Sequence, residues 1–113
     1  MTEIVKQLLP VEGWHVVLAY REEAGGIGVD IEKLLAWALV EVTYRDGEVE
    51  SEIHGVFMGE TRPIVCTSSE MGGSYAYKIV GYFEHDDLEK NADYFQNRGL
   101  ELVSASERNE AKR

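Results

Sequence analysis

The sequence predicts an α+β fold that is mainly β: an antiparallel β-meander of five or six strands, forming a small barrel-like or strongly curled sheet. We expect a short N-terminal helix and a C-terminal helix beside this sheet. Three observations favour this class. Apolar and polar residues alternate along several short segments, Asp46-Gly47 forms a hairpin turn signal between two of them, and the chain contains six tyrosines, which are enriched in strands.

The first elements are predicted from capping residues and periodicity. Thr2 is a suitable N-cap for a short helix over residues 2–9, in which Ile4, Val5, Leu8 and Leu9 share one side. Pro10 ends this helix, since proline cannot continue it. Residues 14–22 alternate as a strand, and residues 23–30 form a glycine-rich loop.

A long β-hairpin follows, with strands over residues 34–45 and 48–58. An Asp-Gly loop suits a type I′ turn, and this turn would place Val40 opposite Ile53. The pattern then predicts that Tyr44, Val40, Ile53 and Phe57 face the core. Residues 31–39 also fit a helical stripe, so both a helix and a strand remain open for that segment, with the strand favoured.

The second half of the sequence predicts two more strands and then a helix. The strands cover residues 64–68 and 74–83, separated by a turn at Met71-Gly72-Gly73. Leu88, Ala92 and Phe95 recur at helical spacing, which predicts a helix over residues 87–98 that Gly99 ends. A short strand over 100–103 would complete a single globular domain, 1–103, and residues 104–113 would form a flexible polar tail.

The second face of the hairpin is charged near the turn and apolar far from it. Leu35, Trp37, Val56 and Met58 make up the apolar part and are the predicted interaction surface. Monomers seldom leave such a patch exposed to water, so we expect it to be buried under the helix at 87–98 or in a two-fold homodimer.

Size and charge restrict the classes of partner. At 113 residues the chain is long enough for one core, and its formal net charge is −10. That charge disfavours nucleic acid and anionic membranes, because no basic stripe is present to displace counterions. The lone Cys66 and the lack of a signal-like or membrane-spanning apolar run predict a cytoplasmic location.

Candidate catalytic residues are few. His15, His54 and His85 lie on different predicted elements, and none has the spacing typical of a metal site. We therefore expect that they do not share a site, that Cys66 is buried and inert, and that the protein uses no catalytic residue, metal or cofactor.

These observations lead to three hypotheses. The first is a non-catalytic protein-interaction domain that associates with itself or with another protein. The second is a small-molecule-binding or enzymatic domain with a pocket in the mouth of the curled sheet, lined by His15, His54 or Tyr77. The third is an inhibitor in which acidic side chains imitate nucleic-acid phosphates.

Overall fold

The computed structural model describes residues 1–71 and 77–111, and within them it contains six strands, one long helix and three short helical segments. The strands are β1 (Thr2–Pro10), β2 (Trp14–Arg21), β3 (Ile27–Thr43), β4 (Val49–Met58), β5 (Pro63–Val65) and β6 (Lys78–Glu84). The helical elements are α1 (Ser68–Met71), α2 (His85–Leu88), η1 (Glu89–Asn91) and α3 (Ala92–Ala111). The predicted mainly antiparallel sheet with a C-terminal helix is confirmed.

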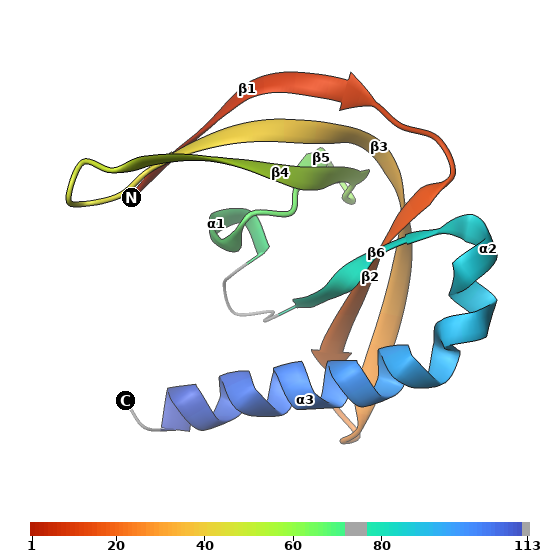
Figure 1. The fold of residues 1–113 in the computed structure, drawn as a ribbon. Helices are drawn as coiled ribbons and strands as arrows, with labels where there is room; N and C mark the ends of the chain where they lie inside the picture. The colour runs from red at the N-terminus through yellow and green to blue at the C-terminus, as the bar shows by residue number, and fades with distance from the viewer. Residues whose placement is uncertain (72–76, 112–113) are drawn as a thin grey trace.

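The sheet is organised around the long strand β3, which bends so that its two halves have different neighbours (Figure 1). Its first half pairs with β2, and its second half pairs with β4 on one edge and β1 on the other. All of these pairings are antiparallel, and the strand order is β5-β4-β3-β2-β6 with β1 attached to β3. In the described residues the sheet does not close into a barrel.

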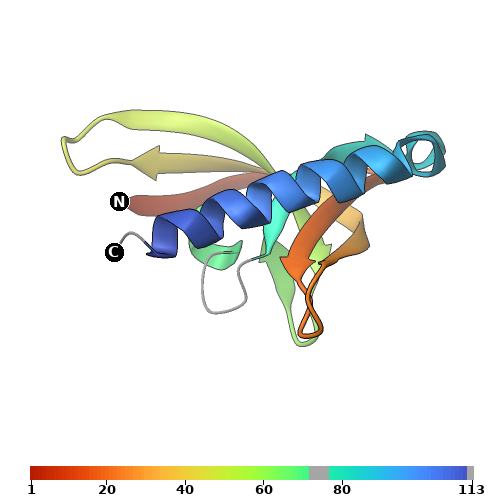
Figure 2. The same ribbon diagram turned by 90° about the horizontal axis from the view of Figure 1, so that it is seen from below.

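Strand β2 lies in the middle of the molecule and is buried on both faces. Val16 and Leu18 point into the main core, where they pack with Leu34 and Phe57. The opposite face of β2 packs against α3, which crosses the sheet (Figure 2). The four consecutive apolar residues 16–19 are therefore all buried, as expected for a strand covered on both faces.

The predicted N-terminal helix is wrong, because residues 2–10 form strand β1. A β-bulge between Val5 and Gln7 inserts Lys6 and reverses the inward–outward alternation of the strand. The pairs Ile4-Val5 and Leu8-Leu9 lie on either side of the bulge, and their separation matches helical spacing. Within each pair, however, the two side chains point to opposite faces of the strand. The apolar pattern alone could not distinguish these two structures.

The hairpin strands are confirmed, including the strand assignment for residues 31–39, but β3 begins at Ile27, within the predicted glycine-rich loop 23–30. The predicted turn and register are wrong. Gly47 has a φ of +89° and Asp46 has a negative φ, whereas a type I′ turn needs a positive φ at both residues. Tyr44 N–H donates to Glu48 O at 2.8 Å, and Gly47 N–H donates to Tyr44 O at 3.0 Å. This is a three-residue loop with a bulge at Gly47.

The longer loop shifts the hairpin register by one residue. Val40 pairs with Glu52, so Ile53 faces outward and is exposed instead of facing the core. Val40 and Phe57 are buried as predicted, and Tyr44 is half-buried against the cluster that contains Val40.

The C-terminal helix is longer than predicted. It runs to Ala111, so residues 100–103 are helical, and residues 104–111, expected as a tail outside the domain, belong to α3. Gly99 does not end the helix: it is buried, and a Cβ atom added to it would lie 2.8 Å from the Ala19 Cβ atom. The glycine allows the helix to approach β2 closely.

The two remaining strands are confirmed with shorter bounds, as β5 and β6. Met71 belongs to α1, while Gly72, Gly73 and the first residues of the predicted strand 74–83 lie outside the described residues. No helix among the residues that the structure describes is both long and apolar enough to cross a membrane.

Candidate functional site

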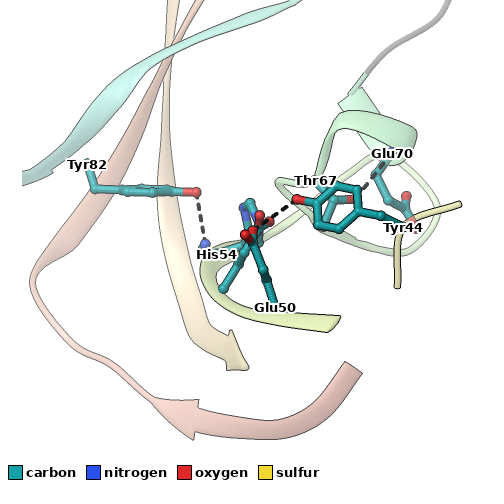
Figure 3. A network of polar contacts seen from close by, with 8 residues as sticks. Tyr44, Glu50, His54, Thr67, Glu70 and Tyr82 are labelled. Carbon is teal, nitrogen blue, oxygen red and sulfur yellow. Dashed lines mark hydrogen bonds and ion pairs between the residues drawn. The ribbon is translucent and has the colours of Figure 1, made fainter. Parts of the chain in front are cut away.

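A polar cluster lies on the inner face of the β3–β4 hairpin, which we define as the face that carries Val40 (Figure 3). The Tyr44 hydroxyl donates to Glu50 Oε2 at 3.1 Å, and His54 Nε2 lies 2.8 Å from Glu52 Oε1. Glu50, Glu52 and His54 share this face because alternate strand residues point the same way. The hydrogen bond to the Glu50 carboxylate raises the pKa of Tyr44. Both carboxylates therefore already have partners within the chain, which gives no support to the phosphate-imitation hypothesis.

Tyr82, a half-buried tyrosine, lies close to this cluster. The Tyr82 hydroxyl accepts a hydrogen bond from Gly55 N–H at 2.9 Å (Figure 3). The same hydroxyl also contacts the Cys66 thiol. Burial raises the pKa of Tyr82, and it raises the pKa of Cys66 to about 11. Cys66 is thus protonated at neutral pH and shielded from solvent, which confirms the prediction of a buried thiol and makes it a poor nucleophile.

The structure brings two of the three histidines together, which contradicts the prediction for that pair. His85 N–H donates to Gly13 O at 2.9 Å, and this contact places the first residue of α2 beside the start of β2. The rings of His15 and His85 are 5.5 Å apart between centroids. The sequence separation of 70 residues hid this proximity, because it depends on the pairing of β2 with β6.

His15 is the less accessible of the two histidines. Its Nδ1 atom is buried and has no hydrogen-bond partner in the structure. Burial lowers the pKa of His15, and the nearby His85 and Lys33 lower it further. Within the described residues, no group of three or more His, Cys, Asp or Glu side chains is placed to hold a metal ion.

The other residues of the predicted pocket do not join this pair. His54 lies in the polar cluster on β4, and Tyr77 packs its ring against Tyr20 with centroids 5.3 Å apart. His15, His54 and Tyr77 therefore each have different neighbours: His85, Glu52 and Tyr20.

The predicted interaction surface is also divided. Val56 is buried on the inner face of the hairpin, whereas Leu35 and Met58 are 45% and 55% exposed. Trp37 is half-buried and packs against Trp14 and Tyr82, at centroid distances of 5.8 Å and 5.0 Å. The hairpin register is shifted by one residue, and a second irregularity in the β3–β4 pairing lies between Leu34 and Ala36. Together they separate the four side chains that the predicted pairing would have placed on one face.

A cluster of exposed apolar side chains lies instead on β1, at an edge of the sheet. Four large apolar side chains of this strand are exposed: Ile4 46%, Val5 46%, Leu8 58% and Leu9 42%. The pairing of β1 with β3 divides them between the faces. Val5 and Leu8 lie opposite Val40 and Ala38 on the inner face, and Ile4 and Leu9 lie on the other.

The second edge of β1 is open. In the described part of the chain, β1 pairs with β3 alone, so its outward-pointing N–H and C=O groups have no strand beside them. An unpaired edge with exposed apolar residues is a template for pairing with another chain. Sequence reasoning missed this surface because it assigned the same residues to a short helix with its four apolar residues on one side.

No family model matches the chain, and no curated protein and no solved structure matches it either.

Proposed function

We propose that this chain is a non-catalytic protein-interaction domain and that β1 is its binding element. The observation that carries the proposal is the exposure of Ile4, Val5, Leu8 and Leu9 on an edge strand. Burying apolar surface stabilises a complex by about 25 cal/mol per Å², and monomers rarely expose clustered apolar side chains.

The recognition mode that fits this surface is strand addition. An extended segment of the partner pairs with the open edge of β1 through main-chain hydrogen bonds, and its side chains contact the apolar residues on both faces. Val5 and Leu8 on one face, and Ile4 and Leu9 on the other, supply the side-chain contacts that strengthen the pairing of two strands.

The thiol and two carboxylates that could serve catalysis have structural roles, which supports a non-catalytic function. The Cys66 thiol is buried and protonated. The Glu50 carboxylate is hydrogen-bonded to Tyr44, and the Glu52 carboxylate is hydrogen-bonded to His54. The proposed compartment is the cytoplasm, because a single cysteine offers no intramolecular disulfide.

A synthetic strand tests the proposal. The probe is a fluorescein-labelled peptide as long as β1, alternating valine and threonine and flanked by lysines for solubility. Its matched control carries proline in place of the central valine, which removes a backbone donor. Fluorescence anisotropy should show saturable binding of the first peptide to the full chain and little binding of the second.

The binding element is identified with two chain variants. Leu8→Lys should abolish peptide binding, whereas Leu100→Lys, which changes a comparably exposed leucine on α3, should leave it intact. Equal binding of both peptides, or a chain that neither binds the strand peptide nor associates with itself, would contradict the proposed function.

One observation favours a second candidate, which is binding of a small ligand or metal ion at His15 and His85. The two rings are adjacent, and His15 Nδ1 is buried without a partner. Titration of the protein with zinc, followed through the histidine ring signals by NMR, tests it. Shifts confined to these two rings and lost in His15→Gln would support the candidate, and unchanged ring signals would dismiss it.

A further inference from the structure

We infer that the partner of β1 is the β1 strand of a second copy of this chain, paired antiparallel about a two-fold axis between Lys6 and Gln7. The inference rests on the proposed function and names its partner. It follows from the order of residues in β1, the face on which each one lies, and the charge of the strand.

The order of apolar and polar residues in β1 reads the same from both ends. Two apolar residues, two polar residues and two apolar residues follow one another as Ile4-Val5-Lys6-Gln7-Leu8-Leu9. In an antiparallel pair about an axis between Lys6 and Gln7, Ile4 of one copy lies opposite Leu9 of the other, and Val5 lies opposite Leu8. All four exposed apolar residues thus meet an apolar residue.

The faces agree with this register. A two-fold axis perpendicular to a sheet keeps each face of one strand on the same face of the other. Val5 and Leu8 both lie on the inner face, and Ile4 and Leu9 both lie on the outer face. Directly opposite side chains would therefore be in contact across the interface.

Other registers lose this match. A shift by one residue places inner residues opposite outer ones, and a shift by two places Val5 opposite Lys6 and Ile4 opposite Gln7. Lysine, a bulge and proline on an edge all discourage unspecific pairing. In β1, these three features disfavour other registers. The register that remains favourable is the one in which the two bulges lie side by side and Pro10 falls at the end of the strand pair.

Charge also favours β1 as the contact between two copies. The chain carries a net charge of −10, so most of its surface repels a second copy. Strand β1 carries one acidic residue, Glu3, and one basic residue, Lys6, and is therefore neutral. It is a surface on which two acidic molecules can approach closely, and pairing there joins their two sheets into one.

Sedimentation of the full chain tests for the second copy. The wild type and Leu100→Lys should show a concentration-dependent dimer. In Leu8→Lys the dissociation constant should rise at least about tenfold, because lysine would replace leucine at two equivalent positions of the interface. Circular dichroism should show an unchanged fold, since Leu8 is 58% exposed.

Disulfide cross-linking tests the register. A mixture of Val5→Cys and Leu8→Cys chains should form a disulfide between the two variants under oxidising conditions. Either variant alone should not, because identical positions would be about 10 Å apart along the strands, beyond disulfide reach. The wild type, with its buried Cys66, is the control for background oxidation.

The outcomes separate the inference from the proposed function. A monomer at all concentrations that still binds the strand peptide would overturn the inference and leave the proposed function standing. A dimer that cross-links through other positions would overturn the register. A chain that neither dimerises nor binds the peptide would overturn both.

Discussion

At the scale of single residues, glycines allow aromatic rings to approach the backbone. A Cβ atom added to Gly55 would lie 2.6 Å from Tyr82 Cε1, and one added to Gly28 would lie 2.2 Å from Tyr20 Cζ. The first of these approaches brings the Tyr82 hydroxyl within hydrogen-bond distance of the Gly55 N–H group. Aromatic rings over glycines replace the side-chain contacts that these strand positions lack.

The half-buried Tyr82 gives the first prediction. Tyr82→Phe should lower the free energy of unfolding by about 1–3 kcal/mol, because it leaves the Gly55 N–H group without its acceptor. Urea unfolding followed by circular dichroism measures the change. Tyr94→Phe is the control, since Tyr94 is exposed on α3, and it should be neutral. An equal decrease in the free energy of unfolding in both variants would show that the hydrogen bond between Gly55 and Tyr82 does not stabilise the fold.

The second prediction concerns His15 and pH. Because the folded protein holds the pKa of His15 below its ordinary value of 6.5, the unfolded state binds a proton more readily. The free energy of unfolding should therefore fall as pH decreases through about 6.5. Urea unfolding at about pH 7.5 and pH 5.5 should show this loss in the wild type and a smaller loss in His15→Gln. His54→Gln serves as the control, and an identical pH response in all three proteins would contradict the prediction.

At the scale of elements, α3 packs closely against strand β2 of the sheet. Phe95, Gly99 and Val103 lie on its buried face, and Gly99 is the point of closest approach to Ala19. Farther along the helix, Arg21 donates two hydrogen bonds to the Glu107 carboxylate, at 2.7 Å and 3.0 Å. The helix is thus fixed to β2 at two successive positions.

Filling the space at Gly99 gives the third prediction. Gly99→Val should lower the free energy of unfolding by about 1–3 kcal/mol, because the added methyl groups would push α3 away from Ala19. Asn97→Ala, on the exposed side of the same helix, should be neutral or slightly stabilising because alanine favours helices. Thermal unfolding of both variants measures the difference. A stabilised Gly99→Val would mean that helix propensity outweighs the close approach.

At the scale of the whole molecule, the bend of β3 produces one well-covered region and one open edge. The part of the sheet around β2 has the core on one face and α3 on the other (Figure 2). Strand β1 lies outside this region, and nearly all of its residues are exposed. The open edge of β1 therefore follows from the bend of β3 and from the position of α3.

Net charge gives the fourth prediction. Two copies that each carry −10 repel one another, while their proposed contact through β1 is apolar and neutral. Raising the ionic strength from about 0.05 M to about 0.5 M should strengthen dimerisation, because salt screens the repulsion and barely affects apolar contacts. Sedimentation at both ionic strengths measures this effect. Weaker association at high salt would indicate an interface held by ion pairs.

The sequence by itself determined the mainly antiparallel sheet, the hairpin, the C-terminal helix and the burial of Cys66. These follow from alternation, turn residues and helical spacing, which act over short distances along the chain. Tertiary structure decided the rest. The bulges at Lys6 and Gly47 changed which residues share a face, Gly99 packs where local signals predict a helix end, and the β2–β6 pairing joined His15 to His85. The loop at Gly47 is local, and its turn type was misassigned. Each of the other features depends on a partner distant in the sequence, and local preference does not encode such a partner.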